Sequence, residues 1–389
     1  MTYFEKALTL NDTIIKDRRW FHTNAEVGLH MPKAQTYVLS RLSEMGIVGR
    51  PCGGGVVAEI GSGDRVLLLR ADMDALPMPE ESGEPFACPT GTEAHTCGHD
   101  FHAAMLLSAA SMLKANEANL KGRVRFMFQP AEETFEGAKA MMADGLFDNG
   151  KPDAAMALHV TAGRMPTGLV MYNAGQTMMF SADGFRLTIK GKGSHGAYPH
   201  LSVDPINIGV HIHLALQELI AREADPTKSA ILTIGKFEAG AAANIIPDTA
   251  ILEGTLRTND AKVRSLLVRR IKEVAEGTAA LFGGSVELTV LSDVPPLLCD
   301  KTLTDKMVGF IKELPIPNLN FLPEVSSSAS EDFAFIAEQI PAVFMYVSAG
   351  FTDERGDASA HNPKVRFNEG VCPIGAAALA HCAERYLES

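Results

Sequence analysis

The feature that most constrains the fold is the alternation of strand-like and helix-like segments along the chain. Four short apolar runs have the character of buried strands, namely "VVAEIG", "RVLLLRADM", "RVRFMFQP" and "DAAMALHV". Helical spacing of apolar residues is found over 4–22, 33–45, 101–116 and 137–147. Strands that alternate with helices favour a mostly parallel sheet with helices on both faces, so we expect an α/β fold.

The middle of the chain follows a different order. "DGFRLTIKG", "SAILTIGKFEAG", "TAILEGTLRT" and "SVELTVL" have the pattern of strands, and helical segments are predicted over 204–223 and 260–283. The resulting order, β-α-β-β-α-β, is that of a small α+β unit of the ferredoxin-like kind. The alternating pattern then resumes. We therefore predict a discontinuous α/β domain over 1–180 and 292–389, interrupted by an inserted domain over 181–291.

Composition excludes several classes of function. The chain of 389 residues has 35 basic and 47 acidic residues and a formal net charge of −12, which disfavours nucleic acid or an anionic membrane surface as a partner. The first residues, "MTYFEKALTLNDTIIKDRRW", lack the pattern of a signal peptide, and no apolar run is long enough to span a bilayer. Six cysteines without framework spacing are typical of reduced thiols, so we expect a cytoplasmic protein.

Residues that can bind a metal or take part in catalysis cluster where the predicted strands end. Because ligands of an open α/β sheet collect outside the carboxyl ends of its strands, we expect these side chains to share one rim. Asp100, at the start of the third predicted helix, is expected to be its N-cap. The candidates that follow strands or precede that helix are Asp72, Asp74, Cys97, His99, Glu132, Glu133, His159 and His361.

The chemistry of these residues indicates a metal site. Thiolate, imidazole and carboxylate are the usual ligands of zinc and similar divalent ions. Glu132 and Glu133 would point apart in extended chain, so that one binds metal and the other faces an activated water. Each residue also has an ordinary structural explanation, such as a solvated Glu pair or a core histidine. It is their joint position at strand ends that favours the metal.

Eight stretches resemble the aminoacylase/carboxypeptidase family of two-metal peptidases. The likeness is greatest to the amidohydrolase branch, which includes hippurate hydrolases, N-acyl-amino-acid amidohydrolases and plant auxin-conjugate hydrolases. The matching stretches are "RADMDALPMPE", "HTCGHDFHAA", "FQPAEETFEGAKAMMADGLF", "ALHV", "GKGSHGAYPHLSVDPI", "NIIPDTAILEGTLRT", "SEDFAF" and "HNPKVRF".

The resemblance implies residue roles. Cys97, His99, Glu133, His159 and His361 match the metal ligands, and Cys97 takes the bridging place. Glu132 matches the general base, and Asp74 an acid that orients a ligand. In the inserted domain, His195 matches a histidine that holds substrate and oxyanion. Asn244 and Arg257 match positions that recognise the substrate carboxylate. A homodimer through the inserted lid and dimerisation domain is implied as well.

The reaction implied is hydrolysis of the amide bond of N-acyl amino acids, hippurate-like or N-acetylated, by metal-bridged hydroxide with Glu132 as base. Two divalent ions per subunit are expected, zinc first, with manganese, cobalt or nickel as alternatives. A metallo-carboxypeptidase or dipeptidase acting on short peptides or acyl-diaminopimelate is the alternative activity. One departure is "RRWFHTNAEVG", which has Ala25 where the family has proline. We expect that segment to lie away from the metals and to affect substrate preference.

Three other functions are open to this sequence. "GKGSHG", residues 191–196, satisfies a dinucleotide-binding pattern, but Pro199 and Pro205 delay the helix that should follow at once. Cys97 could be the nucleophile of a cysteine hydrolase. The activity of such an enzyme would survive removal of metal by a chelator, whereas the activity of a metal enzyme would not. A non-catalytic relative kept for binding would be inert towards a panel of N-acyl amino acids.

Overall fold

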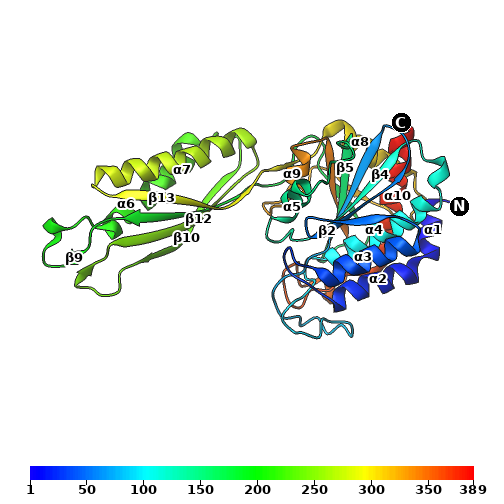
Figure 1. Ribbon diagram of the computed structural model, residues 1–389, viewed down its shortest axis with the longest axis horizontal. Helices are drawn as coiled ribbons and strands as arrows, with labels where there is room; N and C mark the ends of the chain where they lie inside the picture. The colour runs from blue at the N-terminus through cyan, green and yellow to red at the C-terminus, as the bar shows by residue number, and fades with distance from the viewer. The chain divides into compact units, whose positions relative to one another are not determined.

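The computed structural model describes residues 1–389 and contains one large mixed sheet. Its order is β1-β2-β4-β3-β5-β16-β6-β15, and β4, β3, β5 and β16 run parallel as its centre (Figure 1). The strands are β1 (Gly49–Cys52), β2 (Gly55–Gly61), β3 (Val66–Asp72), β4 (Arg123–Gln129), β5 (Ala154–Thr161), β6 (Val170–Tyr172), β15 (Phe321–Leu322) and β16 (Ala342–Ser348).

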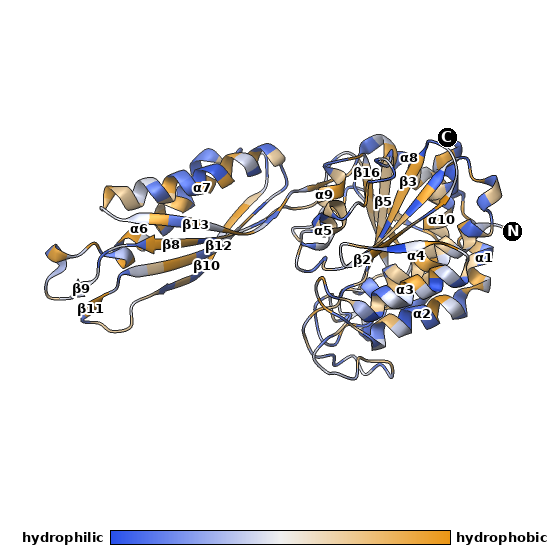
Figure 2. Cartoon of the chain, viewed as in Figure 1, coloured by the Kyte–Doolittle hydropathy of each residue, from blue (hydrophilic) through white to orange (hydrophobic).

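Helices cover both faces of this sheet, which confirms the predicted α/β class. Contacts from α4 and α10 reach β3 and β5 on one face, while α5 and α9 contact β4 and β16. The buried strands are hydrophobic along most of their length (Figure 2). The helices are α1 (Tyr3–Thr9), α2 (Asn11–Thr23), α3 (Pro32–Glu44), α4 (His99–Lys114), α5 (Gly137–Ala143), α8 (Lys301–Glu313), α9 (Ala334–Ala337) and α10 (Cys372–Glu388).

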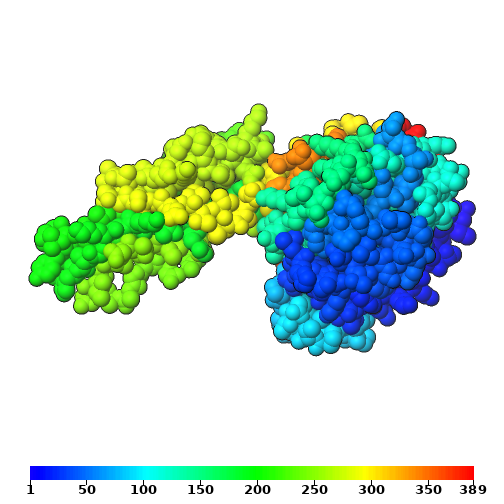
Figure 3. All heavy atoms as spheres, in the orientation of Figure 1, coloured from blue at the N-terminus to red at the C-terminus, as the bar shows by residue number.

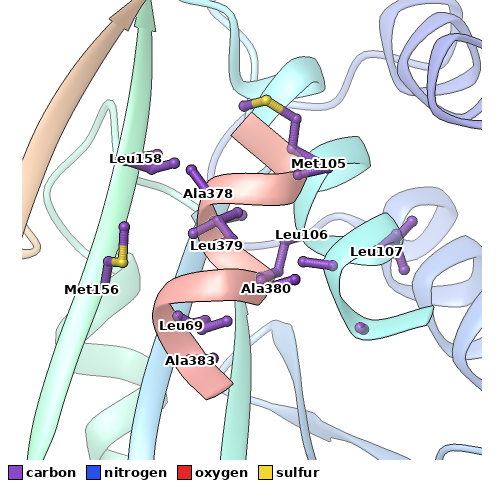
Figure 4. Close-up of a cluster of buried hydrophobic side chains, with 14 of the residues drawn as sticks. Leu69, Met105, Leu106, Leu107, Met156, Leu158, Ala378, Leu379, Ala380 and Ala383 are labelled. Carbon is purple, nitrogen blue, oxygen red and sulfur yellow. The ribbon is translucent and has the colours of Figure 1, made fainter. Parts of the chain in front are cut away.

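The core lies between the central strands and the pair α4 and α10. Leu69 on β3 and Leu158 on β5 face Leu106 on α4 and Leu379 on α10 (Figure 4). Residues of β3 alternate between the two faces, because successive side chains of a strand point in opposite directions. Leu67 and Leu69 belong to this core, so Arg70 and Asp72 point to the opposite face of the sheet.

A second compact unit has its own sheet and core. Its antiparallel order, β10-β12-β8-β13, with two helices, agrees with the split β-α-β-β-α-β pattern. A separate apolar core includes Leu187, Ile212, Leu252 and Leu267. Its elements are β8 (Ala182–Lys190), β9 (Ser194–His195), α6 (Pro205–Glu218), β10 (Ala230–Ala239), β11 (Ile245–Ile246), β12 (Thr249–Thr258), α7 (Ala261–Leu281) and β13 (Ser285–Val294).

The two units divide the chain discontinuously. The larger one comprises 1–178, 298–326 and 332–389, and the inserted one comprises 179–297 and 327–331. In a space-filling view, N-terminal residues, coloured blue, form much of the visible surface of the larger unit (Figure 3). The strands β7 (Thr177–Met179) and β14 (Leu297–Leu298) lie at the boundaries. No helix has the length and apolarity that crossing a membrane requires.

Two local predictions were wrong. The first predicted helix is two helices, α1 and α2, which meet at Leu10. Asp100 is not the N-cap of α4, which starts at His99 after Gly98 in the left-handed region at φ 95°. The Asp100 carboxylate instead forms ion pairs with Arg18 and His22 on α2. The fold brings these two partners, distant in sequence, to the carboxylate, which therefore does not accept the N–H groups at the start of its own helix.

Candidate metal centre

The five candidate ligands lie in the larger unit, where the ends of several central strands meet. Cys97 Sγ, a ring nitrogen of His99 and a Glu133 oxygen all lie within 4.8 Å of one another. The Nε2 atom of His159 is 3.6 Å from Cys97 Sγ, and that of His361 is 3.3 Å from Glu133 Oε1. The structure therefore brings together the five residues that the family resemblance implies as metal ligands.

A tight turn places the first two of them. Gly98 separates Cys97 from His99 and has φ 95°, which is the left-handed region that glycine enters without strain. A Cβ atom at this position would lie 2.3 Å from Cγ2 of Val160 on β5. Only glycine fits here, so the turn and the close approach to β5 both depend on it.

Backbone carbonyls fix the orientation of two imidazoles. Nδ1 of His99 donates to the carbonyl oxygen of Asp74 at 2.9 Å, and Nδ1 of His159 donates to that of Val160 at 2.6 Å. Each ring then presents Nε2 to the cluster, which is how metal-binding histidines are commonly held. Nε2 of His99 is buried without a hydrogen-bond partner. A buried, unpartnered ring nitrogen that faces a thiol and carboxylates fits a bound cation.

His102 and Asp72 also lie within reach of His99 and His159, but their polar atoms are otherwise engaged. His102 Nε2 accepts the Val160 N–H at 2.8 Å, and its Nδ1 donates to Asp72. The other oxygen of Asp72 accepts from Arg70 at 2.7 Å. These hydrogen bonds make His102 and Asp72 supports of the cluster.

Asp74 contacts two of the candidate ligands. Its carboxylate accepts the backbone N–H of Glu133 at 3.0 Å, and its other oxygen is 3.3 Å from Nδ1 of His99. The strand-end acid thus lies behind both His99 and Glu133, at the position expected of a group that orients them.

Glu132 and Glu133 do not point apart, contrary to the prediction from extended chain. They lie in a turn, where Ala131 has φ 51° and Phe135 has φ 59°. An oxygen of each carboxylate lies 3.9 Å from Nε2 of His99. The turn after β4 therefore brings both carboxylates to the same imidazole.

Electrostatics of the cluster follow from burial and mutual contact. Burial raises the pKa of the Cys97 thiol to about 12, although His99 acts to lower it. Burial also acts to lower the pKa of His99, but Asp72 and Cys97 outweigh it and the pKa is raised. His361 has a raised pKa because it hydrogen-bonds to Glu133. The carboxylates thus stabilise positive charge at this place.

Sequence reasoning missed a buried polar network beneath the cluster. Nε of Arg70 donates to Gln129 at 2.9 Å, and Gln129 donates to Asp332 at 2.6 Å. Asp332 also accepts the backbone N–H of Ala138 at 2.9 Å. A charged Arg70 inside the apolar run "LLLRAD" was the available signal, because a buried arginine needs an anionic partner.

The three candidate substrate residues lie in the inserted unit. Asn244 and His195 are neighbours, since the Asn244 carbonyl accepts the Gly196 N–H at 2.8 Å and Ile245 pairs with His195. Nδ1 of exposed His195 accepts the Ala197 N–H at 3.0 Å. Arg257 on β12 is part-buried and donates to Ser330.

The "RRWFH" segment was expected to lie away from the metals, but it lies next to the metal cluster. Arg18 and His22 both bond to Asp100, the residue that follows His99. Ala25, the departure from the family pattern, packs with Ala75 and Cys88 in a small apolar cluster.

Comparison with known proteins gives the chain its family. The model described as "Peptidase family M20/M25/M40" matches residues 68–385. An N-acetyl-L-cysteine deacetylase of Bacillus subtilis (strain 168) is 37% identical over 98% of this chain and 90% of its own. An IAA-amino acid hydrolase of Arabidopsis thaliana is 37% identical over 99% of this chain and 88% of its own length. A solved structure described as a dinuclear metal-binding M20 peptidase from Bacillus subtilis is 30% identical and has a TM-score of 0.82. The match covers 98% of this chain and 99% of that one. The chain belongs to peptidase family M20/M25/M40.

Proposed function

We propose that this protein is a metal-dependent amidohydrolase that cleaves N-acyl amino acids to a carboxylic acid and a free amino acid. The observation that carries the proposal is the convergence of a thiol, three imidazoles and a carboxylate, with an oxygen of Glu132 beside them, 3.9 Å from Nε2 of His99. Both curated relatives act, by their names, on acylated amino acids, which supports this substrate class.

We assign two divalent ions per subunit to Cys97, His99, Glu133, His159 and His361. Bound ions would supply positive charge that polarises the amide carbonyl and acidifies the attacking water. Zinc suits the mixture of thiolate, imidazole and carboxylate, and manganese, cobalt and nickel are the alternatives. Metal analysis of protein purified without added ions tests both number and identity.

We assign Glu132 as the general base. Its carboxylate is buried within reach of the candidate ligands, where it can take a proton from water and return it to the leaving amine. Replacing Glu132 by Gln keeps the shape of the side chain and removes the basic oxygen. We expect kcat to fall by at least about 100-fold while both ions are retained.

Glu136→Gln is the matched control, because Glu136 lies four residues further on and bonds only to Thr134 among side chains. It should leave kcat within about twofold of native, since no proton transfer is assigned to it. Full activity in Glu132→Gln with normal metal content would exclude the assigned base.

We assign recognition of the substrate to His195, Asn244 and Arg257. Because Nδ1 of His195 accepts a backbone N–H, its proton lies on Nε2, which can donate to a developing oxyanion. Arg257 offers a guanidinium to the substrate carboxylate. Arg257→Ala should raise KM about tenfold for N-acyl amino acids but not for their carboxamides. Arg269→Ala, on the exposed face of α7, is the control.

A carboxypeptidase or dipeptidase that cleaves short peptides or acyl-diaminopimelate is the second candidate. The family description, a peptidase family, favours it. A substrate panel that varies acyl group and amino acid independently separates the two. Higher kcat/KM for unacylated dipeptides than for any N-acyl amino acid would decide for the peptidase.

We also propose a cytoplasmic homodimer that associates through the inserted unit. Exposed apolar side chains on α6, Val210 and Leu214, and on the edge strand β10, Ile231 and Phe237, support this surface. Sedimentation equilibrium should give twice the chain mass of 41.7 kDa. The cytoplasmic location rests on the spacing of the cysteines and stays a prediction.

A further inference from the structure

A second cluster of buried charges lies next to the candidate metal centre and has been given no role. Nε of Arg18 is 2.8 Å from the Asp100 carboxylate, and His22 Nδ1 is 2.7 Å from the same oxygen. On its other side, Nε2 of His22 is 3.0 Å from both oxygens of Glu80. All four side chains are at most 6% exposed.

The charges of this cluster are mutually compensated. Burial acts to lower the pKa of His22, but Asp100 and Glu80 outweigh it and the pKa is raised. A protonated His22 donates from both ring nitrogens, one to each carboxylate. Removing one partner from such a cluster leaves an uncompensated buried charge, which is strongly unfavourable.

The cluster connects two segments that carry candidate ligands. Asp100 directly follows His99 in the first turn of α4. Glu80 belongs to the loop between β3 and α4. Glu81, the residue after it, donates its backbone N–H to the carbonyl oxygen of Pro363 at 2.7 Å. Pro363 is two residues beyond His361.

His361 needs such external support. Its side chain is 52% exposed, and its backbone has φ 63°, the left-handed region that non-glycine residues seldom adopt. Its N–H donates to the Thr96 carbonyl at 3.0 Å, and the Arg366–Glu84 ion pair at 2.6 Å joins the same two segments again. Packing alone therefore does not fix His361.

We propose that Glu80 and His22 are positioning residues that hold the His361 segment in register with His99, so that both imidazoles present Nε2 to the same cations. This rests on the ligand roles given under the proposed function. Glu80 anchors the loop that binds the His361 segment, and His22 links that anchor to Asp100 at the start of α4.

The test is a double-mutant cycle of Glu80→Gln and His22→Gln, read out as metal affinity. Each variant is stripped of ions and titrated with Zn²⁺ in competition with a chromophoric chelator. We expect at least one site to weaken about tenfold in each single variant, as for other outer partners of metal ligands. The double variant should be no weaker than the weaker single variant, because the pair acts as a unit.

Glu59→Gln is the matched control. Glu59 on β2 pairs with Arg123 and Arg125 at 2.8 Å and 2.7 Å, and it contacts no candidate ligand. We expect its metal affinity to stay within twofold of native. Affinities of Glu80→Gln within twofold of native, or an equal loss in Glu59→Gln, would overturn the proposal.

Two further measurements separate the possible failures. If Glu80→Gln does not fold when stripped of ions, Glu84→Gln is the substitute variant, because it breaks the partly exposed ion pair to Arg366. It should weaken metal binding at the same site severalfold. Unchanged metal affinity in Glu84→Gln would count against the positioning roles. Excess metal should restore activity to Glu80→Gln but not to Glu132→Gln. A native protein that binds no ion contradicts the proposed function, whereas equal binding by native and variant contradicts only the positioning roles.

Discussion

At the scale of single residues, the hydrogen bond made by one ring nitrogen determines what the other can do. His99 and His159 use Nδ1 on carbonyl oxygens and keep Nε2 for the cluster. His102, one turn of helix beyond His99, has both nitrogens engaged and is left as a support. Three histidines that look alike in the sequence therefore have two distinct uses.

His102→Ala should destabilise the protein even when no metal is bound. The substitution leaves the Val160 N–H buried without an acceptor and takes a donor from Asp72, in addition to creating a cavity. We expect the free energy of unfolding of the metal-free protein to fall by about 3 kcal/mol. Denaturant titration measures it.

His102→Gln serves as the comparison, because its amide oxygen can accept the Val160 N–H. It should lose clearly less stability than His102→Ala. Equal losses in the two variants, or less than about 1 kcal/mol in His102→Ala, would show that these hydrogen bonds do not matter for stability.

At the scale of elements, α4 and α10 approach each other closely in the core of the larger unit. Gly375, inside α10, faces Met105 on α4, and a Cβ there would be 2.1 Å from its sulfur. Both residues are buried, so the Met105 side chain cannot move out into solvent. A Cβ atom at position 375 would therefore force the end of the Met105 side chain to move within a packed core.

Gly375→Ala and Gly309→Ala should therefore have opposite effects. Alanine at a helix interior is worth about 1 kcal/mol over glycine, and Gly309, exposed on α8, has open space for a Cβ. We expect Gly309→Ala to raise the melting temperature of the larger unit. Gly375→Ala should lower it, at a cost of about 1–3 kcal/mol for overpacking. Calorimetry measures both, and stabilisation by Gly375→Ala would contradict the account.

At the scale of the whole molecule, the chain forms two compact units with separate apolar cores. All five candidate metal ligands belong to the larger unit, whereas His195, Asn244 and Arg257 belong to the inserted one. A cation that binds only the folded larger unit stabilises that unit and not the other.

Calorimetry of the intact protein should consequently resolve two transitions with different responses to metal. Adding ions at about 1,000 times their Kd contributes about 4 kcal/mol to the larger unit. Its transition should rise by several degrees while that of the inserted unit stays in place. Equal shifts of both transitions on adding metal would show that metal binding stabilises the inserted unit as well.

Much of the fold follows from local pattern. The strands β2, β3, β4 and β5 and the helices α4 and α7 were predicted within a few residues, because short continuous apolar runs indicate buried strands and apolar residues at period 3.6 indicate helices. The split of the first helix at Leu10 was missed, since no proline or glycine marks it. Family membership was likewise predicted from short stretches and is confirmed by the comparisons.

By itself the sequence determined which residues could meet, since polar side chains that follow parallel strands emerge at one edge of the sheet. Only the tertiary structure decided how they meet: that the turn at Ala131 directs both glutamates to His99, and that Asp100 pairs with Arg18 in place of capping its helix. The physical reason is the range of the interaction. Periodicity and caps act over a few neighbours, whereas a ring nitrogen or a buried carboxylate is committed by whichever partner the fold brings to it, here from 82 residues away.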